Sequence, residues 1–289
     1  MASRFRRHGG RYRRRVLRPF GFRVLAACIR VKVDGREPEW ASERRIEERA
    51  LNASGAFQSL VYDGWLLGYR PGPTKRLRCV NPFYPSTLPL EKKVLHCISF
   101  YAAARLPAIF RLLPFSEPST LDAWLERNGW AAFERTLVLR CSLAELAESP
   151  HSNEPVTIID PPAWEPLVAE LLDIAPDALP RFIERATGYP LPHAGALIRR
   201  DGEVVACGVL KLEDDHAGLF ALKTAAAWRG RGLGRAVVAA LLGEARRRGA
   251  ATAYLQVTAD NGPALALYRR FGFITAYEYW YRARDGEQH

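Results

Sequence analysis

The chain lacks the sequence features of membrane proteins, of disulfide-rich proteins and of metal-binding proteins. No apolar run approaches the roughly 20 residues of a membrane-spanning helix, which argues against an integral membrane protein. The five cysteines are odd in number and widely spaced, with no Cys-x-x-Cys pair, and the six histidines form no ligand pattern. Neither a disulfide framework nor a metal site is therefore expected. We predict a protein of a reducing compartment, the cytoplasm, that needs no metal ion.

The positive charge of the chain is concentrated at its start. The formal net charge is +11, but residues 1–34 hold ten arginines and Lys32 against the single acid Asp34, so the remainder is nearly neutral. Such a run of like charges stays solvated, and we interpret residues 1–37 as a disordered basic leader. The alternatives are an organelle transit peptide, a lipoprotein signal ending at Cys28, and an arm that binds nucleic acid through its phosphates. Any nucleic-acid binding is expected from this leader alone.

A Walker loop is also missing, because no Gly-Lys-Ser/Thr is present, but residues 229–234 read Arg-Gly-Arg-Gly-Leu-Gly. They lie between an apolar run with strand character (218–222) and a helical pattern (235–248) with apolar residues at i and i+4. The first N–H groups of a helix lack internal partners and attract anions, and glycines let a bound group come close to the backbone. The stretch therefore predicts a pyrophosphate site, with Arg229, Arg231 and Arg235 adding charge. A purely structural turn is the alternative.

Motifs downstream of this loop resemble those of the GNAT superfamily of N-acetyltransferases. Asn261 follows, and then a helical pattern that runs through Tyr268 to Gly272-Phe273, in the order and at the spacing typical of that family. The resemblance covers roughly residues 154–284 and implies acetyl-CoA as co-substrate. It also implies that the end of strand 218–224 splays from its neighbour and offers main-chain groups to the pantetheine arm. The coenzyme-binding residues that it implies are Leu222, Thr224, Arg229, Gly230, Arg231, Gly232, Leu233, Gly234, Arg235 and Asn261.

The same resemblance implies that Tyr268 is the general acid that protonates the departing sulfur. The alternative for Tyr268 is a core aromatic, and for Asn261 a plain helix N-cap before Pro263. Thr224 stands where the family more often has a branched aliphatic residue, and Ala226 where it often has proline. Because the expected contacts at that strand end come from the main chain, we treat both departures as mild.

The resemblance implies an N-acetyltransferase that acts on a primary amine of a small molecule or a peptide. A non-catalytic acyl-CoA sensor or scaffold is the alternative. No residue is assigned as general base, because each candidate is also an ordinary surface acid: Glu213, Asp214, Asp215 and Glu278. Tyr277, Tyr279 and Tyr281 share one face of the last predicted strand, where they line either an acceptor pocket or the core.

The first half of the chain has the same order of predicted elements without the glycine loop. A shift of 143 residues places 91–105 on 234–248, 108–113 on 251–256 and 121–130 on 264–273. The residues that fall on the loop, Ser86 to Glu91, include no glycine. We interpret residues 38–148 as a degenerate GNAT-like domain that does not bind coenzyme A, and residues 154–286 as the acetyl-CoA-binding domain. An unrelated α+β domain in the first half is the alternative.

These patterns predict the fold class. Strands that alternate with helices indicate an α/β fold, which the resemblance makes a GNAT-like three-layer αβα arrangement in two tandem copies. Its central sheet is expected to be mixed and mostly antiparallel. Asp63-Gly64 and Asp201-Gly202 predict two hairpins, and residues 70–76 predict a loop by composition.

Overall fold

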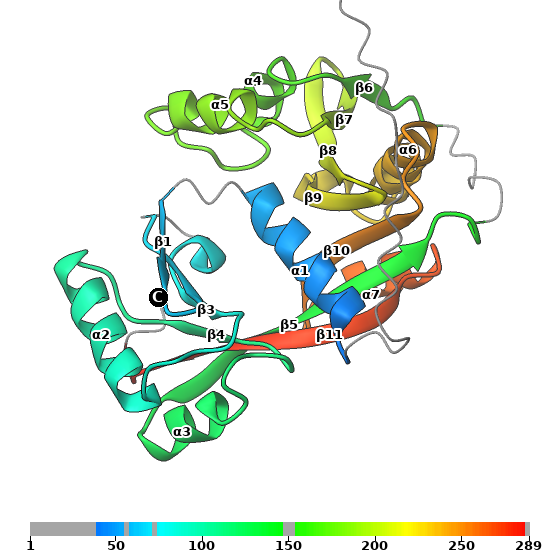
Figure 1. The fold of residues 1–289 in the computed structure, drawn as a ribbon. Coiled ribbons are helices and arrows are strands. Elements are labelled where there is room, and N and C mark those ends of the chain that lie inside the picture. Colours follow the sequence, from blue (N-terminus) through cyan, green and yellow to red (C-terminus); the bar gives the residue numbers. More distant parts are fainter. Residues whose placement is uncertain (1–38, 55–57, 71–73, 147–153, 287–289) are drawn as a thin grey trace, which may run out of the picture. The chain divides into compact units, whose positions relative to one another are not determined.

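The computed structural model describes residues 39–54, 58–70, 74–146 and 154–286. The predicted basic leader, residues 1–37, lies outside the described residues. From Glu39 onward the chain forms one compact unit (Figure 1). No helix in the described ranges is long and apolar enough to cross a membrane.

The first half of this unit begins with a helix and ends with a long strand. The turn between its first two strands has positive φ at Asp63 (42°) and Gly64 (82°), as an Asp-Gly hairpin requires, which confirms that prediction. A short 3₁₀ helix begins inside the predicted loop 70–76, at Lys75, and a short strand follows it; neither was predicted. The elements are α1 (Ala41–Ser54), β1 (Ser59–Tyr62), β2 (Trp65–Gly68), η1 (Lys75–Leu77), β3 (Val80–Pro82), α2 (Leu90–Ala103), β4 (Phe110–Leu112), α3 (Leu121–Arg127) and β5 (Ala131–Ser142).

The second half runs through the expected order of strands and helices. Asp201 and Gly202 again form a turn with positive φ, at 51° and 87°. The elements are β6 (Thr157–Ile159), α4 (Trp164–Val168), α5 (Leu179–Thr187), β7 (His193–Arg200), β8 (Glu203–Glu213), β9 (His216–Thr224), η2 (Ala226–Trp228), α6 (Leu233–Arg247), β10 (Thr252–Thr258), α7 (Gly262–Arg269) and β11 (Ile274–Ala283).

All strands of the described residues join one 11-stranded sheet, in the order β1-β2-β3-β4-β11-β5-β10-β9-β8-β7-β6. Its strand pairs are antiparallel except β3–β4 and β9–β10, which are parallel. The class is therefore confirmed as a mixed, mostly antiparallel α/β fold. The halves exchange their last strands, because β5 lies between β10 and β11 while β11 lies between β4 and β5.

The sheet order repeats about its centre. Reading outward from the β5–β11 pair, each half continues with an antiparallel strand, then a parallel one, then an antiparallel hairpin. Thr136 faces Tyr279 at the centre, and these two residues are 143 positions apart, the shift found in the sequence. The same shift carries α2 onto α6. This repetition supports the interpretation as two tandem copies.

Helices cover both faces of the sheet, because alternate residues of each strand point to opposite sides. Leu139 of β5 packs with the core under α6, whereas the adjacent Val138 packs with Ile46 and Ala50 of α1. Trp280 lies on the α2–α3 side of β11, while Tyr279 and Tyr281 lie on the α1 side. One layer therefore consists of α2, α3, α6 and α7. The other consists of α1, which lies across the middle of the sheet in Figure 1, and of α4 with α5.

Candidate active site

The glycine-rich loop leads directly into α6. Gly230 and Gly232 have φ of 76° and 82°, a conformation that suits glycine because side chains with a Cβ rarely adopt it. A Cβ added at either position would meet no atom within 4 Å, so the space in front of this backbone is open. Within the described part of the chain, no hydrogen bond uses the N–H groups of residues 230–235. The loop thus presents unpaired donors at the positive end of a helix dipole.

Gly234 lies where three elements meet. A Cβ there would contact Thr224 Oγ1 at 3.4 Å and Leu267 Cδ2 at 3.7 Å, so the end of β9 and α7 both approach the first turn of α6. Two of the predicted coenzyme-binding residues, Thr224 and Gly234, are therefore close together, and Leu267 brings the neighbouring Tyr268 into the same region.

The three arginines of the loop are exposed. Arg229 Nε donates to the carbonyl of Thr224 at 3.4 Å, and the Arg231 guanidinium lies over the Trp228 ring at 4.7 Å. In both cases other guanidinium N–H groups have no partner among the described residues and are left to meet an anion.

The two strands next to the loop separate, as the resemblance to the GNAT superfamily implies. Hydrogen-bonded pairing of β9 with β10 covers only Thr252–Tyr254 and His216–Gly218. Beyond that point β10 pairs with β5 and β9 with β8, and a bulge interrupts β9 where Ala221 has φ of 50°. Main-chain groups of β9 near Leu222 and Thr224 therefore have no β10 partner among the described residues.

Tyr268 lies within α7 and Asn261 directly precedes this helix, and the two side chains have different surroundings. Tyr268 is 7% exposed, and its ring meets the Phe273 ring edge to face at 5.9 Å. Burial raises the pKa of the Tyr268 hydroxyl to about 12. Asn261 caps the helix, since its Oδ1 accepts from the N–H of Ala264 at 3.2 Å.

The four candidate bases all have structural partners. Asn52 of α1 donates to Glu213 at 3.0 Å, and Arg49 pairs with Asp214 at 2.9 Å. Asp215 pairs with His216, and Glu278 with Arg135. Two of these contacts hold α1 on the turn between β8 and β9.

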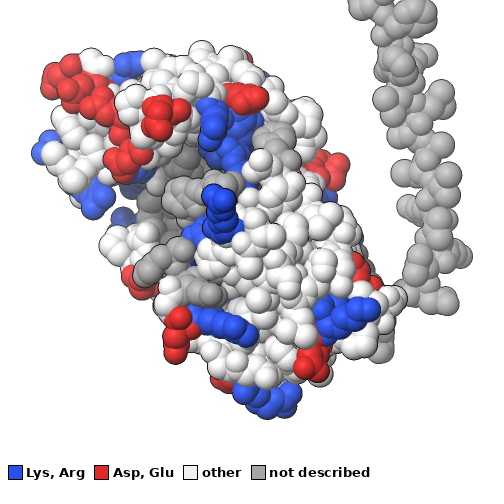
Figure 2. Space-filling model, turned by 90° about the vertical axis from the view of Figure 1, so that its left-hand side faces the viewer, with Lys and Arg blue, Asp and Glu red and all other residues white. Residues whose placement is uncertain are grey.

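Basic side chains gather around a hollow on one face of the molecule (Figure 2). Burial, and after it the charge of Arg185, lowers the pKa of Lys211 to about 8. Burial and the charge of Arg70 lower the pKa of Arg185 itself. Burial also raises the pKa of Glu165, although the charges of Lys211 and Arg185 act in the opposite direction. These groups come from both halves of the chain.

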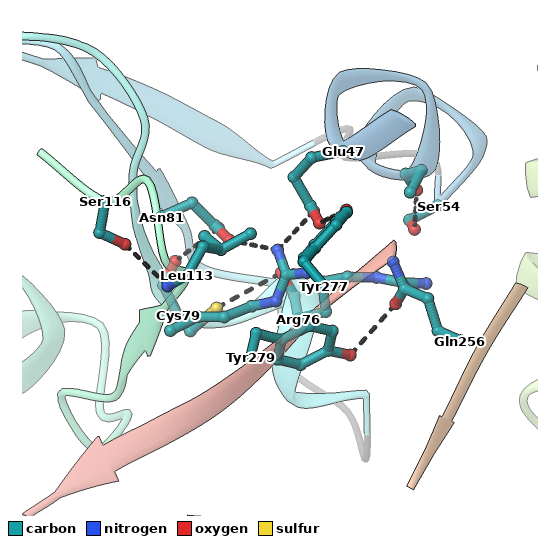
Figure 3. A network of polar contacts seen from close by, with 12 residues as sticks. Glu47, Ser54, Arg76, Cys79, Asn81, Leu113, Ser116, Gln256, Tyr277 and Tyr279 are labelled. Carbon is teal, nitrogen blue, oxygen red and sulfur yellow. Dashed lines mark hydrogen bonds and ion pairs between the residues drawn. The ribbon is translucent and has the colours of Figure 1, made fainter. Parts of the chain in front are cut away.

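Sequence reasoning missed a polar network beneath α1 (Figure 3). Arg111 and Glu47 form a fully buried ion pair at 2.6 Å, and Tyr277 donates to the other Glu47 oxygen at 2.5 Å. Burial opposes the charge of Glu47, but Arg111 outweighs it and lowers the pKa of that carboxyl. Arg76, from the predicted loop, donates to Gln256 of β10. No local pattern reveals these contacts, because their partners are far apart in sequence.

In the first half of the chain, a carboxylate binds the backbone N–H groups that correspond to the free ones of the glycine loop in the second half. Asp63 accepts from the N–H of Thr87 at 3.0 Å and from that of Leu88 at 2.9 Å, just before α2. The 143-residue shift places these two residues on Gly230 and Arg231. The donors before α2 are thus already hydrogen bonded.

No cluster of three potential metal ligands occurs in the ranges that the structure covers. Its cysteines are free and buried: Cys79, Cys97, Cys141 and Cys207.

Known proteins resemble the chain in both sequence and fold. The model of the acetyltransferase (GNAT) family matches residues 162–273. An uncharacterized N-acetyltransferase, YobR of Bacillus subtilis, is 26% identical over 257 residues, which is 83% of this chain and 98% of that protein. The [ribosomal protein bS18]-alanine N-acetyltransferase of Escherichia coli is 33% identical over 93 residues, 32% of this chain and 63% of that enzyme.

A solved structure shares the fold over most of the chain. The GCN5-related N-acetyltransferase from Kribbella flavida superposes with a TM-score of 0.61 at 19% identity, over 84% of this chain and 95% of that one.

Proposed function

We propose, on the premise that residues 162–273 make this chain a member of the acetyltransferase (GNAT) family, that it moves an acetyl group from acetyl-CoA to a primary amine. Membership makes the protein an acyltransferase. The observation that carries the finer proposal is the open glycine loop at the start of α6, beside a pair of strands that separates after Tyr254 and Gly218.

The residues of the loop fit a pyrophosphate. Unpaired N–H groups from residue 230 to residue 235 would bind its oxygens, and Arg229, Arg231 and Arg235 would neutralise its charge. Main-chain groups of Leu222 and Thr224 would bind the amide-containing arm along the unpaired edge of β9. Asn261 supports this site as the cap of α7, and we ascribe no direct coenzyme contact to its Oδ1.

The chemistry requires an uncharged amine and a proton for the leaving sulfur. The amine nitrogen bonds to the thioester carbon, the carbon–sulfur bond breaks, and the amine loses one proton to solvent or a base. Tyr268 would supply the proton that the sulfur takes. With its pKa raised to about 12, its hydroxyl stays protonated at neutral pH and can donate.

Acetyl transfer is tested with a panel of amine acceptors, and the known relatives suggest one member of it. Because one of them acts on an alanine of a ribosomal protein, a peptide with an N-terminal alanine belongs in the panel beside small amines. Release of free coenzyme A from acetyl-CoA is the readout for every acceptor.

Tyr268→Phe tests the role of the hydroxyl. We expect kcat to fall by about 10²–10⁴, the usual contribution of a general acid, while the Kd for coenzyme A measured by calorimetry stays the same. Tyr62→Phe, which removes a hydroxyl from a half-buried residue of β1, is the matched control and should leave both values unchanged. Unchanged kcat in Tyr268→Phe would rule out the general-acid role.

The alternative of a sensor has a distinct outcome. Tight binding of coenzyme A without its release in the presence of any amine of the panel would favour a binding module over an enzyme.

A further inference from the structure

The proposed general acid, Tyr268, and the glycine loop lie on the face of the sheet that α6 and α7 cover, which leaves the opposite face for the approach of the amine. Tyr268 packs with Leu255 and Val257 of β10 on the α6–α7 side. Gln256 lies between those two residues, so its side chain points to the opposite side, toward α1. It is also two positions beyond Tyr254, where β9 and β10 stop pairing. Gln256 therefore borders the acceptor side of the proposed site, and any role for it in acceptor binding rests on the proposed function.

Gln256 is held in one orientation by two donors. Its Oε1 accepts from Arg76 and, at 3.1 Å, from the Tyr279 hydroxyl. Because the Arg76 guanidinium can only donate, the amide oxygen is assigned by this contact and Nε2 faces the other way. That Nε2 is buried and has no hydrogen-bond partner among the described residues.

Other buried donors in the same network also lack an acceptor. They are Arg76 Nε and the two Arg111 nitrogens Nε and Nη2, again counted within the described residues. Arg111 is 0% exposed, stacks on the Tyr279 ring at 3.9 Å and has only Nη1 occupied, by Glu47 and Asn81. Buried donors left without acceptors cost free energy, so a cluster of them indicates a group that brings oxygen atoms.

The charge around these donors is positive. Glu47 balances Arg111, but Arg76 contacts a neutral amide and pairs with no carboxylate in the described part of the chain. Lys211 donates to the Ala53 carbonyl at 2.7 Å and stacks on Tyr189 at 4.1 Å, again without a carboxylate there. Arg185, Glu165 and Arg76 all affect the titration of Lys211, so the three cations lie in one region with a single carboxyl group, Glu165, among these neighbours.

We infer that the acceptor is an anionic amine, whose carboxylate or phosphate group binds Arg76 Nε and Gln256 Nε2 while its amine reaches the acyl group between β9 and β10. Free N–H donors on two side chains that contact each other, one of them charged, suit an oxyanion better than a neutral or cationic group. Lys211 and Arg185 favour the approach of negative charge and disfavour polyamines.

Direct binding tests this inference without a known acceptor. The full chain is saturated with coenzyme A, so that anions cannot bind at the glycine loop, and is titrated with succinate and with inorganic phosphate in a calorimeter. Saturable binding of either probe is expected, and whichever binds identifies the oxyanion. Absence of saturable binding for both would overturn the inference.

Two variants locate the bound probe. Arg76→Gln should weaken binding by about ten- to a hundredfold, as loss of a charged hydrogen bond does. Gln256→Glu should weaken it similarly, because the new carboxylate would itself pair with Arg76. Arg135→Gln, which removes an arginine with a 63% exposed side chain from β5, is the control and should bind as the unmodified protein does. Wild-type affinity in both site variants would contradict the assignment.

Matched acceptors separate this inference from the proposed function. β-Alanine is compared with β-alaninamide, and ethanolamine phosphate with ethanolamine, by release of coenzyme A. We expect a preference of about tenfold or more in kcat/KM for the anionic member, lost in Arg76→Gln. Equal use of charged and neutral members would refute the inference but leave acetyl transfer intact. If no amine releases coenzyme A, the proposed function fails, and the titrations alone decide the anion site.

Discussion

Gly232 and Gly249 lie at opposite ends of α6 with nearly the same backbone conformation. Their φ values are 82° and 88°, and at both positions an added Cβ would enter open space. Replacement by alanine should therefore cost each variant a similar amount of stability, roughly 1–2 kcal/mol for a residue forced into the left-handed region. Only Gly232, however, lies in the loop that we assign to the coenzyme.

Gly232→Ala should thus lose coenzyme A affinity, by about tenfold or more, because its methyl group would stand where the pyrophosphate meets the backbone. Gly249→Ala should bind as before. Calorimetric Kd values, with urea unfolding of both variants, separate the two effects. If the variants lose the same stability and both keep full affinity, the loop is a structural turn and the coenzyme site lies elsewhere.

The conformation of single residues can be predicted from the sequence where it depends on neighbouring residues alone. The positive φ of Gly230 and Gly232 follows from a tight approach to a helix start, which the motif already indicates. The contact of Arg76 was not predicted, because no local pattern around this residue points to Gln256, 180 positions away.

The contact of Asp63 with the segment before α2 shows how elements are joined in the first half. The hydrogen bond from the Leu88 N–H, together with those from Thr87, lowers the pKa of the Asp63 carboxyl well below its usual value of 3.8. A carboxyl group with a lowered pKa in the folded state stabilises the fold above its unfolded-state pKa, and this contribution is lost as the pH falls.

We therefore predict that stability drops steeply between about pH 4 and pH 2 in the unmodified protein and less steeply in Asp63→Asn. The variant should be less stable at pH 7 and should approach the unmodified protein at low pH. Urea unfolding at a series of pH values provides the measurement. Parallel pH profiles for the two proteins would mean that Asp63 titrates alike in both states.

The helices and strands can be predicted from the sequence more completely than the pairing of the strands in the sheet. Apolar spacing predicts a helix at 91–105, and α2 spans Leu90–Ala103. The hairpin turns follow from Asp-Gly pairs. The short strand β3 was missed, since Val80–Pro82 is too brief to show alternation. The position of β5 was also missed, because a strand with one apolar face reads the same whichever strand it pairs with.

The exchange of β5 and β11 has consequences for the whole molecule. β10 pairs with β5 from Thr252 to Thr258, and β11 pairs with the other edge of β5. A second half cut out as a separate domain would lack the strand that joins its last two strands. Where β5 is missing, the apolar side chains beneath it would be exposed to solvent. Backbone N–H and C=O groups of β10 and β11 would also lose their partners.

We predict that residues 154–289, expressed alone, neither fold cooperatively nor bind coenzyme A, and that adding residues 39–148 restores both properties by strand complementation. Circular dichroism melting reports folding, and calorimetry reports coenzyme binding. The continuous segment 39–289 is the control and should bind coenzyme A as the full chain does, since it retains both exchanged strands. A fragment 154–289 that binds coenzyme A with the affinity of the full chain would show that the second half is independent and that β5 is dispensable to its site.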